Sequence, residues 1–507
     1  MSSPGSGIPL FKMKLAETGQ VRDVKKIIAR VTGLPSCLNG QLVDFGDGVR
    51  GIVMGFDQED VLVLVLGDET KLRMGKPVTG VNEPFTIPVG DKCIGRMINA
   101  LGETVDGKQM LVPEARRPVM RDSPTITDRA PVNQPLLTGT KVVDIFVPVG
   151  KGQRQLIVGD RMTGKTVIGI DAIVNQKGKD VICIYCCIGK AMSSLEKAVS
   201  VLHDSGALEY TIVMLALDNA PAGEQYLLPS AAASMGDFFA EKGRDVLVVF
   251  DDLTKHAWAY RQLSLLLERP PGREAYPGDI FYEHTKIMER AGRYCQKKGG
   301  GSMTFLGIAE TLEGDLTGYI PSNLISMCDG LVFLSNSLFG SGARPAVDFT
   351  LSVSIVGGRT QPPVLRAVSS DLRIQYARYL EVSKLSKLQA SVSAEADRVI
   401  KRGEAIVAIV QQSQYAPVSL AEEVILAFAT HAGRLDLLSV DQKKVFCKSI
   451  YDFARRKQPA ILDLIREDTR LTSEVEQKLN DLLDEYFAPR QTEPGRRQSD
   501  LSNPGGS

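Results

Sequence analysis

The pattern of apolar positions predicts a β-rich domain near the start of the chain. Residues 21–95 contain short runs such as GVRGIVMGF and DVLVLVLG, and Gly or Asn-Gly pairs separate these runs. This arrangement is typical of an antiparallel sheet or a small barrel with tight turns. Residues 61–66 are apolar at every position, so we expect this strand to be covered on both faces.

After residue 95 the pattern becomes an alternation of strands and helices. Apolar runs such as QLIVG, DVICIYCCIG and DVLVVFDD are separated by longer periodic segments such as TGKTVIGIDAIVNQK. Over residues 96–365 this alternation predicts a parallel sheet with helices on both faces. Over residues 366–488 apolar residues recur at helical spacing, which predicts a helical domain. The ends, 1–20 and 489–507, are rich in Gly, Ser and Pro, so we expect a flexible N-terminus and a disordered tail.

Composition narrows the class of function. The chain has 507 residues, which suits about three domains. Lys and Arg together number 60, as do Asp and Glu. A protein that mainly wraps nucleic acid usually carries a basic surplus, so no nucleic acid is expected as a partner, although a local basic groove stays open. No run approaches the roughly 18 uninterrupted apolar residues of a membrane-spanning helix, and the start has no signal or transit pattern.

Cysteine and histidine positions indicate no metal site. The eight cysteines are scattered, which favours a reducing compartment. Cys183, Cys186 and Cys187 fall inside one apolar run, so we expect buried thiols there. The four histidines form no ligand cluster in the sequence, and we expect His256 to lie at a surface or an interface.

One motif carries specific chemistry. It fits G-x-x-x-x-G-K-[ST] in full, after an apolar strand and before a helical pattern, and comprises Gly159, Asp160, Arg161, Met162, Thr163, Gly164, Lys165 and Thr166. Such a loop turns its backbone N–H groups toward a phosphate. We expect Lys165 to reach the β- and γ-phosphates of ATP, and the Thr166 hydroxyl to bind Mg²⁺. Asp251 ends a second apolar run and is expected in the same Mg²⁺ shell.

Longer stretches resemble a known family. They include PVNQPLLTGTKVVDIFVPVGKGQRQLIVGDRMTGKT, ERPPGREAYPGDIFYEHTKIMERAGR, GYIPSNLISMCDG and VQQSQYAPVS. The chain resembles the α subunits of rotary F-type ATP synthases over nearly its whole length, and ERPPGREAYPGD favours an α rather than a catalytic β subunit. The resemblance implies an N-terminal β-barrel, a central RecA-like P-loop nucleotide-binding domain and a C-terminal helical domain. It also places Arg344, Pro345, Gln412 and Gln414 on the adenine side of a site that binds ATP or ADP with Mg²⁺.

The resemblance further implies partners. These are a catalytic β-type subunit in an alternating hexamer, a γ-type central shaft and a δ-type subunit of the peripheral stalk. The membrane would be reached only through this complex, as a peripheral protein on the cytoplasmic, stromal or matrix face of an energy-coupling membrane. About twenty residues precede the predicted barrel, where family members usually carry a helix that docks on the stalk, so weaker stalk attachment is a hypothesis.

The sequence departs from the family at positions that carry chemistry. Lys190 stands where catalytic β subunits have Glu and ordinary α subunits have Gln, and a protonated lysine cannot activate water. Ile355 stands at the position of the family's arginine finger, a group worth about 10³–10⁵ in rate. Arg359, four positions later, is a possible substitute, although a plain surface arginine is favoured. Met162 replaces a Gln in the P-loop, a smaller change because the cradle there is backbone.

Together these features predict a non-catalytic, regulatory nucleotide-binding subunit of a rotary ATP synthase that couples ATP chemistry to proton transport. Three alternatives stay open. One is a subunit of a divergent F-like ATPase with a repurposed or uncoupled role, which Ile355 and Lys190 favour. The second is a structural protein that keeps the hexamer shape, and the intact P-loop argues against it. The third is a RecA-like hexameric RNA helicase, against which the balanced charge argues.

Overall fold

The structure is a computed structural model that describes residues 17–386, 393–467 and 470–488. Most of the expected flexible N-terminus and the whole expected tail, 489–507, lie outside the described residues. The chain divides into two compact units. The first is Met1–Pro362 with Val410–Leu420, and the second is Pro363–Ile409 with Ala421–Ser507. The predicted fold class, a β-barrel followed by a nucleotide-binding α/β domain and a helical domain, is confirmed.

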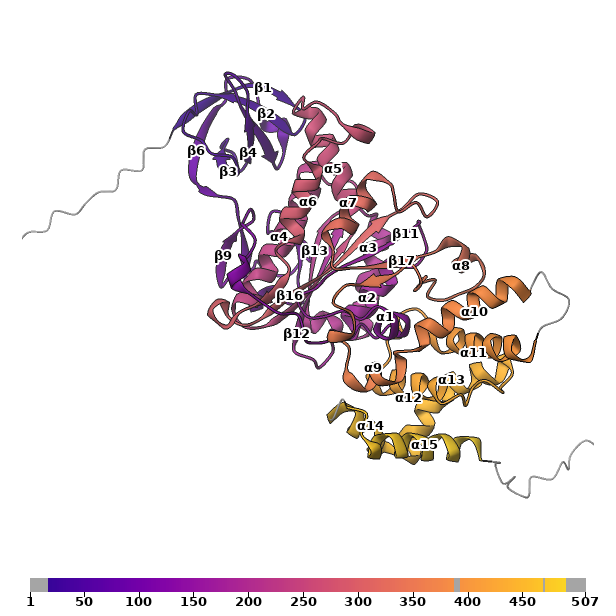
Figure 1. The fold of residues 1–507 in the computed structure, drawn as a ribbon. Coiled ribbons are helices and arrows are strands. Elements are labelled where there is room, and N and C mark those ends of the chain that lie inside the picture. The colour runs from indigo at the N-terminus through magenta and orange to yellow at the C-terminus, as the bar shows by residue number, and fades with distance from the viewer. Residues whose placement is uncertain (1–16, 387–392, 468–469, 489–507) are drawn as a thin grey trace, which may run out of the picture. The chain divides into compact units, whose positions relative to one another are not determined.

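A closed barrel begins the first unit, drawn in indigo in Figure 1. Its strands run in the order β1-β2-β5-β4-β3-β6 around the barrel and comprise β1 (Thr18–Lys25), β2 (Ile28–Thr32), β3 (Gln41–Asp44), β4 (Arg50–Phe56), β5 (Val61–Leu66) and β6 (Pro77–Pro84). The fully apolar β5 serves two cores. Val63 packs in the core of the barrel, whereas Leu64 belongs to the large core that continues into the α/β domain. The expectation that this strand is covered on both faces is therefore confirmed.

The α/β domain is built on a largely parallel sheet. Its order is β18-β17-β11-β16-β14-β12-β13-β8, and its strands are β8 (Met97–Asn99), β11 (Arg154–Gly159), β12 (Val181–Ile188), β13 (Thr211–Ala216), β14 (Asp245–Asp251), β16 (Ser302–Glu310), β17 (Gly330–Leu334) and β18 (Val353–Ser354). Only β18 pairs antiparallel within this path. Short strands complete the domain: β7 (Thr86–Val89), β9 (Ala115–Pro118), β10 (Arg129–Ala130) and β15 (Gly292–Tyr294).

Parallel pairing brings the carboxyl ends of the central strands to one edge of the sheet. Cys187 in β12 lies opposite Asp251 in β14, and Gly159 in β11 lies opposite Glu310 in β16. The helices of the domain are α1 (Lys141–Phe146), α2 (Lys165–Val174), α3 (Met192–Asp204), α4 (Ala222–Glu241), α5 (Leu253–Leu266), α6 (Ile280–Met288), α7 (Tyr319–Met327) and α8 (Asn336–Gly340). This edge is where α/β sheets bind ligands.

The second unit is helical, as predicted. Its helices are α9 (Pro363–Ser369), α10 (Leu372–Ser386), α11 (Ala394–Val410), α12 (Leu420–His431), α13 (Val440–Lys457), α14 (Pro459–Glu467) and α15 (Ser473–Phe487). Ser439 caps the start of α13 in a capping box with Gln442, which satisfies backbone N–H groups that the helix leaves unpaired. Between α11 and α12, residues 410–420 return to the first unit.

The position of His256 differs from the surface or interface position expected from the sequence. The side chain is buried in the core and not at a surface, so the expectation was wrong. It lies on the inner face of α5, where its ring stacks on Tyr226 at 5.6 Å and approaches His284 at 5.3 Å between centroids. The buried thiols Cys183 and Cys186 are confirmed. Within the ranges given above, no group of three His, Cys, Asp or Glu side chains could hold a metal.

Candidate nucleotide-binding site

The P-loop connects β11 to α2 and needs glycine at both of its ends. Gly164 has a φ of 103°, a left-handed conformation that side chains disfavour. At Gly159 the obstacle is space, because a Cβ atom would lie 2.7 Å from the carbonyl oxygen of Leu334. The motif therefore adopts the tight strand–turn–helix geometry that lets backbone N–H groups face a phosphate.

Lys165 is buried at the start of α2. Its Nζ donates to the carbonyl oxygens of Gly159 at 2.8 Å and Asp160 at 2.7 Å. Burial lowers the pKa of Lys165, against the opposing effect of nearby carboxylates that include Glu310 and Asp251. An ammonium held in this way is available to phosphate oxygens, which would replace its carbonyl partners.

Asp160 and Arg161 attach the P-loop to the end of β16 and to the segment after it. The Oδ1 of Asp160 accepts from the Thr311 hydroxyl at 2.7 Å and from the Gly314 N–H at 2.8 Å. Arg161 Nε donates to Glu310 Oε2 at 3.1 Å. Both residues of the predicted motif thus hold the loop in shape through their side chains.

Thr163 and Met162 differ in what their side chains do. The Thr163 hydroxyl donates to the Asp160 carbonyl at 2.8 Å, and the residue lines the neighbouring pocket. Met162 has a φ of 63° and is 90% exposed. Its side chain therefore contributes little to the loop, in keeping with the small weight expected of this substitution.

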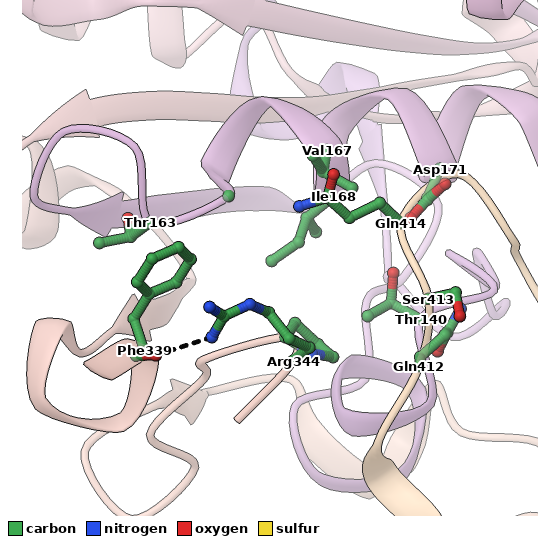
Figure 2. Close-up of a pocket in the computed structure, with 12 residues that line it drawn as sticks. Thr140, Thr163, Val167, Ile168, Asp171, Phe339, Arg344, Gln412, Ser413 and Gln414 are labelled. Carbon is green, nitrogen blue, oxygen red and sulfur yellow. Dashed lines mark hydrogen bonds between the residues drawn. The ribbon is translucent and has the colours of Figure 1, made fainter. Parts of the chain in front are cut away.

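A pocket lies beside the P-loop. It brings together predicted phosphate-side and adenine-side residues, and its lining comprises Thr140, Thr163, Gly164, Val167, Ile168, Asp171, Phe339, Arg344, Pro345, Gln412, Ser413 and Gln414. In Figure 2, Val167 and Ile168 of α2 lie on one side of the pocket, and Phe339 and Arg344 lie on the other. Apolar walls with a few polar groups between them suit a flat, heteroaromatic base.

The predicted adenine-side residues divide into supports and lining groups. The Arg344 guanidinium lies 3.7 Å from the Phe339 ring centroid and donates to the Phe339 carbonyl at 2.8 Å (Figure 2). The Gln412 amide donates to Gly139 O at 2.7 Å and accepts from the Lys141 N–H at 2.9 Å. Gln412 therefore fixes its own segment, whereas the exposed Gln414 is the better placed of the two to contact a base.

Asp171 lines the same pocket and was not predicted. Its side chain is 3% exposed, and its Oδ1 has no hydrogen-bond partner. Burial raises the pKa of Asp171 to about 7, while a backbone hydrogen bond from Tyr415 acts in the opposite direction. A carboxyl group inside the apolar run VIGIDAIV is the sequence signal that could have identified it.

The expected magnesium ligands lie together, but a lysine joins them. The Thr166 hydroxyl donates to Asp251 Oδ2 at 2.9 Å, and the Tyr185 hydroxyl donates to the same oxygen at 3.0 Å. Lys190 Nζ donates to Thr166 Oγ1 at 2.8 Å and forms an ion pair with Asp251 Oδ1. Burial alone would lower the pKa of Lys190, but the charge and hydrogen bond of Asp251 outweigh it, and the pKa is raised.

This arrangement does not fit a divalent cation. Mg²⁺ requires oxygen ligands at about 2.1 Å in octahedral geometry. Here the ammonium of Lys190 contacts both expected ligands, Thr166 and Asp251. A divalent cation between the same two oxygens would lie against this like charge in a poorly solvated place, where the repulsion is large.

Ile355 and Arg359 lie away from the pocket. Ile355 follows β18, is 77% exposed, and donates its backbone N–H to Asp329 O at 2.8 Å. Arg359 ends the 3₁₀ turn Gly357–Arg359 and is also exposed. Neither residue lines the nucleotide pocket of this chain. Both side chains are exposed to solvent.

The P-loop at the carboxyl edge of a parallel sheet, with an apolar pocket beside it, defines a RecA-like P-loop nucleotide-binding protein. Family models of the ATP synthase alpha/beta family match its β-barrel domain over residues 14–82, its nucleotide-binding domain over 139–354 and its C-terminal domain over 361–486. The chain belongs to the ATP synthase alpha/beta family, and within that family it is similar to alpha subunits.

Relatives support this placement. The ATP synthase alpha subunits of Clostridium botulinum strains Alaska E43 and Eklund 17B are 42% identical to it over 477 residues, which cover 94% of this chain and 94% of each relative. The alpha subunit of the Hall strain is 42% identical over 470 residues, 93% of each chain. Through the described part of the chain, no helix is long and apolar enough to cross a membrane.

Proposed function

We propose that this chain is a non-catalytic, regulatory subunit that binds ATP or ADP without hydrolysing it. The observation that carries the proposal is the ion pair between Lys190 and Asp251. Hydrolysis needs a carboxylate free to orient and activate water near the γ-phosphate. At the position where a catalytic subunit has that carboxylate, this chain has Lys190, which is already paired with Asp251.

Two other carboxylates near the P-loop, Asp252 and Glu310, are also engaged. Asp252 accepts from the Lys255 N–H at 2.8 Å and caps α5, and burial followed by the charge of Asp251 raises its pKa to about 7. Glu310 pairs with Arg161. Asp252 is 2% exposed and Glu310 is ion-paired, so neither carboxylate is both open to solvent water and unpaired, which supports binding without turnover.

The expected cofactors are ATP or ADP and Mg²⁺. The P-loop and the apolar pocket support the nucleotide. The predicted Mg²⁺ would have to reach Thr166 and Asp251, both of which contact the ammonium of Lys190. The described residues therefore support nucleotide binding more strongly than they support a metal.

As a member of its family, the chain is part of an ATP synthase complex. We infer that its partners are a catalytic β-type subunit in an alternating hexamer, a γ-type shaft and a δ-type stalk subunit. Membrane association would be peripheral and through the complex, on the cytoplasmic, stromal or matrix face. The family match and the outward-facing segment of Ile355 and Arg359 support this inference.

A divergent complex with slow or uncoupled turnover is the second candidate. The exposed Ile355 favours it, because an apolar side chain cannot stabilise the charge on a phosphoryl group in a partner's site. The RNA helicase alternative finds no support, since the similarity to alpha subunits extends over 94% of the chain.

A complex with a disabled partner tests the proposal. The β-type subunit would carry Gln at its catalytic carboxylate, so that only the site of this chain could turn over. ATP bound to this chain is expected to be recovered intact after hours, by quench and chromatography. Steady hydrolysis that disappears with Lys165→Ala in this chain would contradict the proposal.

A further inference from the structure

Two ammonium groups lie at the P-loop. Lys165 Nζ rests on two loop carbonyls, and Lys190 Nζ rests on Thr166 and Asp251. The two lysines are close enough for the positive charge of one to oppose that of the other. A polyphosphate placed between them would relieve this repulsion, because phosphate oxygens accept charge-assisted hydrogen bonds from ammonium groups.

The donor count of Lys190 leaves room for a ligand. An ammonium has three N–H donors and no acceptor. One is directed to Thr166 Oγ1 at 2.8 Å and a second to Asp251 Oδ1. The side chain of Lys190 is 18% exposed, which leaves the third donor for an oxygen of a bound ligand. The lysine is therefore held in place by protein groups while it keeps one donor for phosphate.

We propose that Lys190 replaces the magnesium ion in this site, so that the chain binds ATP or ADP without a divalent cation. The Lys190 ammonium would take the position between Thr166, Asp251 and the β- and γ-phosphate oxygens. This rests on the proposed function only in that the site binds a nucleotide. It adds that the nucleotide is taken in its metal-free form.

The anchoring of Lys190 carries this assignment. Asp251 is completely buried and lies at the end of a central strand. Removal of Lys190 to admit a cation would break its ion pair with Asp251 and its hydrogen bond to Thr166 together. An ammonium fixed in this way contributes one positive charge where a magnesium ion would contribute two.

Calorimetric titration of the full chain with ADP and with ATP tests the proposal. Each titration is done in excess Mg²⁺ and in EDTA. For the wild-type chain the Kd is expected to change less than about threefold between the two conditions. In Lys190→Gln the site should regain a metal requirement, and the Kd is expected to rise at least about tenfold in EDTA. Lys298→Gln, which removes another ion-paired lysine away from the site, should behave as the wild type does.

A second readout does not depend on any variant. Electron paramagnetic resonance of Mn²⁺ with the ADP-loaded wild-type chain is expected to show no protein-bound ion. A stoichiometric bound Mn²⁺, or a tenfold loss of wild-type affinity in EDTA, would overturn the proposal. Conversion of the bound ATP to ADP would instead contradict the non-catalytic function, and the Kd values would still decide the metal question.

Discussion

The ammonium of Lys190 forms an ion pair with Asp251, whose side chain is fully buried at the tip of β14. Asp251 also accepts hydrogen bonds from Thr166 and Tyr185. Lys190 in turn donates to Thr166, so each member of the ion pair has a neutral partner besides the other. The pair itself has a measurable consequence for stability.

Asp251→Ala and Lys190→Met should each destabilise the chain. The first change leaves a largely buried ammonium without its counter-charge, for which about 3–5 kcal/mol is typical. The second leaves a fully buried carboxylate whose two remaining donors both reach Oδ2, so a loss of similar size, about 3–5 kcal/mol, is expected. Urea unfolding followed by circular dichroism would measure both. A loss below about 1 kcal/mol in either variant would show that the ion pair contributes little to stability.

Ile355→Arg should raise ATP hydrolysis by the assembled complex. Under the proposed function, an arginine at this exposed position would place a positive charge at the partner's site, and such a finger contributes about 10³–10⁵ in rate. We expect a gain of at least about tenfold in kcat, measured with a coupled ATPase assay, and Ile355→Lys as control should give less. An unchanged rate would mean that some other group already supplies the charge.

Arg359→Ala tests directly whether Arg359 supplies the positive charge that Ile355 lacks. Arg359 is exposed at the end of its 3₁₀ turn, where a plain surface arginine would lie. We therefore expect kcat of the complex to change by less than about twofold, since surface substitutions have small effects. A loss of two orders of magnitude would identify Arg359 as the substitute finger. Arg161→Ala would not be a suitable control, because Arg161 holds the P-loop.

Asp171 should make the chain less stable as the pH rises. Its folded-state pKa is raised to about 7 from 3.8, so the folded chain holds this proton more tightly than the unfolded chain does. Stability from this group is complete below about pH 4 and is lost as the pH rises to about 7. Asp171→Asn should therefore be more stable than the wild type at pH 8, by about 1–4 kcal/mol. The advantage should shrink at pH 5, as urea midpoints at both pH values would show.

His256 and His284 should weaken the fold on the acid side. Burial lowers the pKa of His256 to about 4 and also lowers the pKa of His284. Neither ring nitrogen of His284 has a hydrogen-bond partner. A depressed pKa gives stability above the unfolded value of about 6.5, and this stability is lost as the pH falls toward 4. His284→Phe should keep the pH 7 stability and reduce the loss at pH 5. An identical loss in the variant would contradict this origin.

The sequence pattern predicted the fold because it reflects the local preferences of strands, turns and helices. Apolar alternation, turn glycines and helical spacing identified the barrel, the sheet and the helices. The approach of Thr166 to Asp251 followed from the rule that parallel strands end at one edge. His256 was misplaced because its position after β14 does not say which face of α5 packs inward. The partners of Lys190 and the isolation of Asp171 depend on contacts between segments far apart in sequence, which no local pattern encodes.

The return of residues 410–420 to the first unit affects the order in which the protein can mature during synthesis. Gln412 hydrogen-bonds Gly139, a residue 273 positions earlier in the chain. Domains form from the N-terminus as the chain leaves the ribosome. The barrel and sheet can therefore assemble early, but the base-binding wall stays incomplete until a helix of the second unit has also been translated. Nucleotide can then act as a late checkpoint, which stabilises only chains that have been synthesised past this segment.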